Sequence, residues 1–188
     1  MTRARPVGSA ASERGRAGRS ARRPESAITV HGPGTGVPGA SRLPGDLRRL
    51  AAEAARLHGG PVQIDVQLLS DPQIRRLNRT HLGHDWATDV VSFPLSAPDA
   101  PLLLGALAVS RDTARRESTR RGHAPYHELM LYVVHGTLHL LGHDDHAPRA
   151  TARMRRAERE LLAALGLPSV YERPESGRRA RRPRKEVP

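Results

Sequence analysis

The sequence predicts an α+β fold in which a small β-sheet of about four strands is covered by helices. The first observation behind this prediction is that short β-rich runs are interspersed with longer segments of helical periodicity. The second is a segment from 125 to 141 that is apolar on almost every side, as expected of a helix inside the fold. The length of 188 residues suits one domain with its own core.

The first predicted elements lie between residues 27 and 61. Ala27 to His31 is a candidate short strand. Leu43 to Leu57 repeats Leu and Ala at helical spacing and therefore predicts a helix. Gly45 or Asp46 is placed to start this helix, and Gly59-Gly60-Pro61 is placed to stop it.

Three strands and another helix are predicted next. Val62 to Leu69 alternates apolar and polar residues, which indicates a strand with one face inward. Ser70-Asp71 then caps a helix that is expected to run to about Leu82. Runs from Asp89 to Phe93 and from Leu104 to Ser110 predict two more strands, after which the chain turns helical.

Two longer helices are predicted to complete the domain. Pro125 suits a first helical position, and the helix that it begins extends to Leu141, before Gly142. An amphipathic helix follows Pro148 and is ended by Gly166 and Pro168. The residues of this last helix that are expected to face inward are Met154, Leu161, Leu162 and Leu165.

The folded domain is predicted to extend from 26 to 172, between basic tails that we expect to be disordered. Residues 1–25 and 173–188 each carry a net charge of +5, so most of the formal +12 lies outside the domain. Basic arms raise affinity for phosphate backbones without specifying a sequence, although solvated tails without a ligand are the alternative. The Arg- and Ser-rich N-terminus also fits an organellar transit peptide, which the matching C-terminal tail disfavours.

The amino-acid composition excludes several kinds of reactive and metal-binding site. The chain has no cysteine, which excludes disulfides, thiolate nucleophiles, iron-sulfur clusters and cysteine-bound zinc. Any metal must therefore bind to His, Asp or Glu. No stretch has the length of a membrane-spanning helix and the N-terminus has no apolar secretory segment, so we expect a cytoplasmic protein without a membrane partner.

The segment from His135 to His146 reads HGTLHLLGHDDH and contains the candidate metal ligands. His135 and His139 stand four residues apart on the buried helix, so their imidazoles project from one face near its C-terminal end. Gly142 permits a left-handed turn that brings the chain back with further nitrogen and oxygen ligands. The spacing predicts a metal site with three protein ligands and an open position, and leaves the third ligand undecided.

Hydrogen-bonded core histidines are the alternative to a metal site. Burying two imidazoles without partners costs on the order of 1 to 3 kcal/mol each, which disfavours that alternative for two rings in one turn. The metalloprotease signature has the same histidine spacing but places a Glu beside the first His. Gly136 occupies that position, so a protease of that type is not expected.

The motif HGTLHLLGHD resembles the signature of the YbeY-type endoribonucleases. The resemblance covers most of residues 62 to 166. The further segments that carry it are Leu77-Asn78, TDVVSFP from Thr88 to Pro94, Leu104-Gly105 with Val109-Ser110, Asp112 to Ala114, Glu128 before VVHG, and ERELLAALGL near the end of the domain.

The resemblance implies a small mixed β-sheet with a helical layer. It also implies a zinc-dependent endoribonuclease that is specific for single-stranded RNA. It implies a role in maturation of the 3′ end of 16S ribosomal RNA and in ribosome quality control, with ribosomal RNA and the small ribosomal subunit as partners. One zinc ion per chain would be held by His135, His139 and, by register, Asp145, with His146 as the rival third ligand. No side chain is identified as a catalytic base.

The chain departs from the family pattern at two positions. The usual third ligand is a His where this chain has Asp145, and a carboxylate should make a zinc-bound water somewhat less acidic. The family also usually has an Arg suited to a phosphate contact where this chain has Leu82. The residues that could replace it are Arg75, Arg76, Arg79, His81 and His84, although the arginines could equally have only a surface role.

Two other functions remain as alternatives at this stage. The first is a non-catalytic, ribosome-associated RNA-binding assembly factor with a structural metal. The basic tails and Leu82 favour it, whereas a set of three ligands opposes it because structural zinc usually has four. The second is oxygen chemistry at iron held by two His and one carboxylate, which the family resemblance disfavours.

Overall fold

The computed structural model describes residues 24–32, 36–81, 83 and 85–171. It confirms an α+β fold with a mixed four-stranded sheet. The elements in chain order are β1 (Ala27–His31), a short 3-10 helix η1 (Ala40–Arg42), α1 (Leu43–His58), β2 (Val62–Leu69), α2 (Asp71–His81), β3 (Val90–Pro94), β4 (Leu103–Ser110), α3 (Arg111–Arg121), α4 (Pro125–Leu140) and α5 (Pro148–Ala164).

The strands lie in the order β1-β2-β4-β3. β1, β2 and β4 are parallel, and β3 runs antiparallel along β4. Every second residue of β2 from Val62 to Leu68 is buried, as the alternating sequence predicts. β4 is buried on both faces toward its end, because α2 packs there through Ile74 against Val91 and Ala108.

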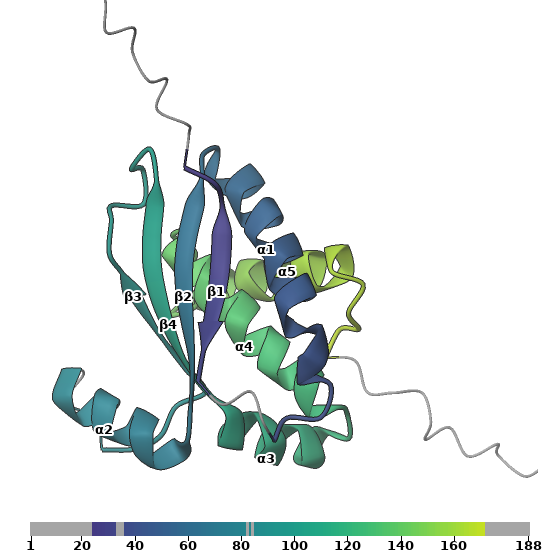
Figure 1. The fold of residues 1–188 in the computed structure, drawn as a ribbon. Helices are drawn as coiled ribbons and strands as arrows, with labels where there is room; N and C mark the ends of the chain where they lie inside the picture. Colours follow the sequence, from purple (N-terminus) through teal and green to yellow (C-terminus); the bar gives the residue numbers. More distant parts are fainter. Residues whose placement is uncertain (1–23, 33–35, 82, 84, 172–188) are drawn as a thin grey trace, which may run out of the picture.

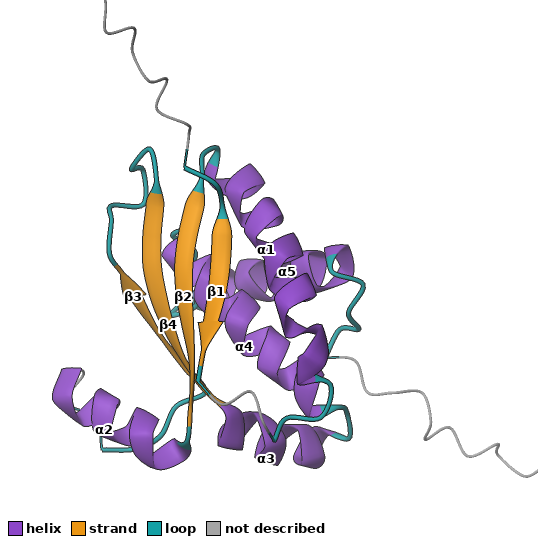
Figure 2. Ribbon diagram, in the orientation of Figure 1, coloured by secondary structure: helices purple, strands orange, loops and turns teal. Residues whose placement is uncertain are grey.

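One face of the sheet is covered by α1, α4 and α5 (Figure 1). The secondary-structure colouring shows α2 and α3 at one end of the sheet, where β2 and β4 end (Figure 2). This arrangement puts α4 between the sheet and α5, so its residues meet protein on nearly all sides. Of its 16 residues, 12 are buried, which confirms the prediction from its apolar sequence.

Gly136 allows α4 to approach the sheet closely. A Cβ atom at this position would lie 2.8 Å from Leu107 Cδ2 and 3.0 Å from Val90 Cγ2. The Ser92 hydroxyl also donates a hydrogen bond of 3.2 Å to the Gly136 carbonyl. The middle of α4 is thereby held against β3 and β4, and the residues on either side of Gly136 are fixed relative to the sheet.

The structure corrects the predicted start of the first long helix. α1 begins at Leu43, so Gly45 and Asp46 lie inside its first turn instead of starting it. Asp46 is buried and accepts a hydrogen bond of 2.5 Å from the Tyr126 hydroxyl of α4. The carboxylate therefore links two helices, which local sequence patterns do not reveal.

The other predicted elements are found with boundaries shifted by at most one or two residues. Met154, Leu161, Leu162 and Leu165 face inward, as predicted. Position 82, the expected end of the second helix, lies outside the described residues, as do nearly all of the two predicted tails; their disorder stays a prediction. Within the described part of the chain, no helix has the length and apolar character needed to cross a membrane.

Candidate metal centre

The two histidines of the motif face each other at the C-terminal end of α4. The ring centroids of His135 and His139 are 4.5 Å apart, and their Nε2 atoms are separated by 3.0 Å. Gly142 has φ 88° and ends the helix, while the His143 amide donates a 3.0 Å hydrogen bond back to the Leu138 carbonyl. The predicted left-handed turn is confirmed, and it returns the following residues toward the two rings.

The opposite ring nitrogens are occupied by fixed acceptors. His135 Nδ1 lies 2.6 Å from Glu158 Oε1 on α5, and His139 Nδ1 lies 2.9 Å from the His143 carbonyl oxygen. A carboxylate and a carbonyl accept hydrogen bonds, so each ring carries its proton on Nδ1. In the neutral rings both Nε2 lone pairs then converge, and a proton or a metal cation between them must offset their repulsion.

Asp145 completes a group of three. Its Oδ2 atom is 3.7 Å from His135 Nε2, and its Oδ1 atom is 3.8 Å from His139 Nε2. Two ligands of a tetrahedral zinc ion, each about 2.1 Å from the metal, are separated by roughly 3.4 Å. The three observed separations lie on either side of this value, so the group could hold a metal ion.

His146 occupies a different position. Its side chain is 87% exposed, and its Nδ1 atom is 2.5 Å from Asp144 Oδ1. It forms a second acidic group with Asp144 and Asp145, without His135 or His139. The turn thus brings Asp145 to the histidine pair and directs His146 toward solvent.

Glu158 is buried against the outer side of His135. It is 1% exposed, and its Oε2 atom accepts a 2.5 Å hydrogen bond from the Tyr171 hydroxyl. Burial by itself lowers the pKa of His135, but the hydrogen bond and the charge of Glu158 outweigh burial and raise it. Burial and the same carboxylate raise the pKa of Tyr171, so its hydroxyl stays protonated and keeps donating.

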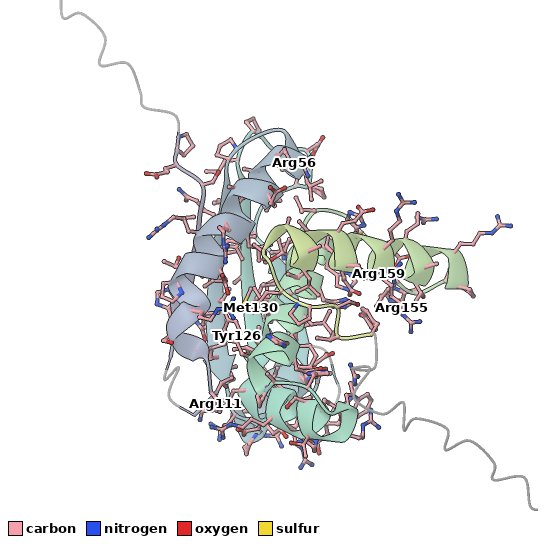
Figure 3. The ribbon with its side chains drawn as sticks, turned by 90° about the vertical axis from the view of Figure 1, so that its right-hand side faces the viewer. Arg56, Arg111, Tyr126, Met130, Arg155 and Arg159 are labelled. Carbon is pink, nitrogen blue, oxygen red and sulfur yellow. The ribbon has the colours of Figure 1, made fainter. Side chains whose placement is uncertain are left out.

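A cavity of about 230 Å³ opens beside two of the three residues, His135 and Asp145. His135, Asp145 and Glu158 form part of its wall, and Arg121 and Arg155 bring two guanidinium groups to the same space. Figure 3 shows Arg155 and Arg159 extending from α5, and of these two only Arg155 lines the cavity. A candidate metal group next to cationic side chains is suited to an anionic ligand.

The comparison with protein families decides what kind of protein carries this site. The profile of the family described as "Endoribonuclease YbeY" matches residues 46–166, which is more than half of the chain. The chain belongs to this family. The resemblance noted in the sequence is thereby confirmed, and the matched region contains α4, the turn at Gly142 and the whole of α5.

Two relatives named "Endoribonuclease YbeY" illustrate the similarity within the YbeY family. The protein from Anaeromyxobacter sp. is 46% identical over 120 residues, covering 63% of this chain and 62% of the relative. The protein from Rhodopirellula baltica is 39% identical over 125 residues, covering 65% of this chain and 64% of the relative. The alignment therefore spans somewhat less than two thirds of these relatives.

A solved structure supports the fold. The solution structure of TM1509 from Thermotoga maritima matches with a TM-score of 0.54 and 24% sequence identity. The match covers 81% of this chain and 99% of the other. At this level of identity the likeness concerns the fold alone.

Several residues of the centre were not predicted as site residues. Glu158 and Asp89 were named only as members of predicted elements and of the segments ERELLAALGL and TDVVSFP, and Arg155 and Tyr171 were not singled out. One signal was present for Glu158, which lies four residues after Met154 and therefore on the inward face of the predicted amphipathic helix. Of the proposed replacements for the family Arg, His84 lies outside the described residues, as does position 82 itself, whereas Arg75, Arg76, Arg79 and His81 all lie on α2.

Proposed function

We propose that the chain is a zinc-dependent endoribonuclease that cleaves single-stranded RNA, with one ion held by His135, His139 and Asp145. The observation that carries this proposal is the 3.0 Å approach of two Nε2 atoms whose rings both have a hydrogen-bond acceptor beside Nδ1. A bound cation offsets the repulsion between those lone pairs. Two imidazoles and a carboxylate are a known catalytic zinc set, with a further position left for water or substrate.

RNA is the substrate class that the family name supports, since both relatives described above are named endoribonucleases. We place the activity in maturation of the 3′ end of 16S ribosomal RNA and in ribosome quality control in the cytoplasm. Ribosomal RNA and the small ribosomal subunit are the proposed partners. The formal charge of +12 suits a polyanionic partner.

A divalent cation at these residues would supply Lewis-acid polarisation of the scissile phosphodiester and of an attacking water. Glu158 orients the proposed ligand His135, because its carboxylate holds the ring and its Nδ1 proton in place. Both Glu158 oxygens are engaged, one by His135 and one by Tyr171, so Glu158 acts as a positioning residue.

The cationic wall of the cavity provides the charge that a phosphate needs. Arg121 lies 3.0 Å from Glu128 Oε1 and 3.6 Å from Glu117 Oε2, so its charge is largely committed. Arg155 forms no salt bridge with any described residue, and its Cζ atom lies 5.7 Å from the centroid of the Tyr171 ring. Arg155 is therefore the residue that we assign to neutralising the scissile phosphate.

The test compares His135→Ala with His31→Ala. His31 is an exposed histidine on β1 whose imidazole contacts Asp65, far from α4 in sequence. Elemental analysis and cleavage of a labelled single-stranded RNA should show that His135→Ala loses both zinc and activity, while His31→Ala keeps both. Undiminished cleavage by metal-free His135→Ala would refute the proposal. RNA binding without turnover by the wild-type chain would instead fit a non-catalytic assembly factor.

A further inference from the structure

A second surface on α2 combines a groove, an exposed aromatic ring and positive charge. The groove has a volume of about 720 Å³ and lies along one face of α2 and the segment after it. Arg75, Arg76 and Arg79 line it from the helix, and Trp86 lines it from the following segment. Trp86 is 58% exposed and is the only tryptophan of the chain.

The arginines that line the groove differ in whether they form salt bridges. Arg75 forms two hydrogen bonds to the Asp85 carboxylate, of 3.0 and 2.7 Å, so this pair is close to neutral. Arg76 and Arg79 form no salt bridge with any residue that the structure describes. They lie three residues apart on the groove side of α2, so two guanidinium groups face solvent close to the indole.

A short segment of the chain joins the groove to the cavity beside the metal centre. Trp86 lines the groove, and Asp89, three residues later, lines the cavity that contains His135 and Asp145. Three extended residues span at most about 11 Å between Cα atoms, so these two wall residues of the groove and the cavity are no farther apart than this. Figure 1 shows α2 at the end of the sheet where β3 begins. Asp89 directly precedes β3 and therefore lies at the same end of the sheet.

An exposed indole beside two guanidinium groups that form no salt bridge with a described residue fits an unpaired nucleotide. Bases stack on aromatic rings when they are not already stacked in a duplex, and arginines track the phosphates between them. The Trp86 main chain is also held in place, since the Asn78 side chain donates a 2.8 Å hydrogen bond to the Trp86 carbonyl. The segment that carries the indole is therefore anchored to α2 instead of being a free loop.

We propose that this groove binds single-stranded RNA on its way to the metal centre, with a base stacked on Trp86 and phosphates held by Arg76 and Arg79. This inference rests on the proposed function, because it assigns the path of the same substrate. It adds a binding site whose wall residue Trp86 has its Cα atom at most about 11 Å from that of Asp89, in the wall of the cavity where cleavage is placed.

Trp86 itself reports the interaction, because tryptophan emission from this chain comes from one residue. The full chain is mixed with a single-stranded oligoadenylate in a stopped-flow instrument, and emission is recorded before cleavage proceeds. Saturable quenching is expected with the single strand. A duplex of the same length should quench far less, because its bases are already stacked.

Variants separate stacking from charge. Trp86→Ala should weaken binding of the oligoadenylate, measured by anisotropy, by about 5- to 150-fold, and Trp86→Phe should restore most of the affinity. The double variant Arg76→Gln/Arg79→Gln should reduce the slope of log affinity against log salt by about 1.4. The controls are Leu95→Ala, an exposed apolar residue that is 64% exposed after β3, and Arg48→Gln on α1; neither should change binding.

The outcomes distinguish the groove from the nuclease. RNA binding in the groove is refuted if Trp86→Ala binds the oligoadenylate with unchanged affinity. It is also refuted if anisotropy reports binding while the emission of Trp86 does not change. The groove would then be a site for a protein partner. Cleavage by the wild-type chain and its loss in His135→Ala then still support the nuclease. Conversely, the wild-type chain could show quenching but no cleavage, while Trp86→Ala binds RNA more weakly. That result would support RNA binding in the groove and refute the nuclease activity. Failure of the wild-type chain to bind RNA also overturns the groove.

Discussion

The Nδ1 atom of His135 lies 2.6 Å from Oε1 of Glu158, so a buried carboxylate on α5 fixes the orientation of a ring on α4. The two residues are 23 positions apart in the sequence. Glu158 is also held by the Tyr171 hydroxyl, which leaves it little freedom to move. The proposed metal ligand is thus supported from behind by two residues that belong to other segments of the chain.

Glu158→Gln should weaken zinc binding by about 10- to 100-fold, because the amide keeps the shape of the side chain but removes the charge that makes His135 a better ligand. Competition with a chromogenic chelator measures the affinity. Glu160→Gln is the matched control, since Glu160 lies on the same helix but is exposed and pairs with Arg156. Equal zinc affinity in the two variants would remove Glu158 from the centre.

Asp145→Ala and His146→Ala should behave differently, because only the Asp145 carboxylate lies within 4 Å of both ring nitrogens. The Asp145 variant is expected to lose most of its zinc and its RNA cleavage. The His146 variant should keep near wild-type zinc content, since its imidazole is exposed and contacts Asp144. Zinc quantification on both proteins, alongside an RNA cleavage assay, checks this assignment, and the reverse pattern would name His146 as the third ligand.

The histidine pair could be predicted from sequence because a spacing of four residues on a helix is local geometry. The same holds for the turn after it, which needs only a glycine at position 142. The strands were predictable for a similar reason, since alternation in β2 is a property of one segment. Their order in the sheet was not, because pairing β4 between β2 and β3 depends on contacts between distant segments.

Contacts between side chains of different helices could not be predicted from local sequence patterns either. Asp46 was expected to start a helix because Asp is common there, but its carboxylate is buried against Tyr126, which is 80 positions away. Glu158 carried only the weak signal of a charged residue on an apolar face. Tertiary contacts decide both cases, and a single sequence does not specify them.

Tyr126→Phe should lower the free energy of unfolding at pH 7 by about 1 to 3 kcal/mol, because the buried Asp46 carboxylate loses a hydrogen-bond donor. Burial raises the pKa of Asp46, but the hydrogen bonds from Tyr126 and Arg49 outweigh it and lower the pKa. A carboxyl whose pKa is lower in the folded state stabilises the protein above its unfolded pKa of about 3.9, and this stability is lost as pH falls through the folded value.

The difference between wild type and Tyr126→Phe should therefore shrink when the pH is lowered from 7 toward about 3. Urea denaturation at both pH values measures it. Thr29→Val is the control, because it removes a donor to Asp65, whose side chain is 60% exposed, and should have little effect at either pH. A difference between wild type and Tyr126→Phe that does not depend on pH would argue against the Asp46 contact.

Gly136→Ala should destabilise the fold by up to about 2 kcal/mol. The added methyl group would meet Leu107 and Val90 at 2.8 and 3.0 Å, and overpacking of this kind costs about 1 to 3 kcal/mol, partly offset by about 1 kcal/mol of helix propensity. Gly45→Ala on α1 is the control, since a Cβ there meets nothing within 4 Å and should leave stability equal or slightly higher. Urea denaturation of both variants decides the point, and similar gains in both would mean that α4 can move away from the sheet.

Arg155→Gln should lower kcat/KM for single-stranded RNA by about 10- to 150-fold, because a charged hydrogen bond to phosphate contributes about 1.5 to 3 kcal/mol. Its zinc content should not change, since Arg155 lines the cavity without contacting the three proposed ligands. Arg159→Gln, one turn along α5 and outside the cavity lining, is the matched control and should stay close to wild type. Equal losses in the two variants would indicate that the general positive charge of α5 attracts the RNA, whereas a loss confined to Arg155→Gln places the scissile phosphate in the cavity beside His135.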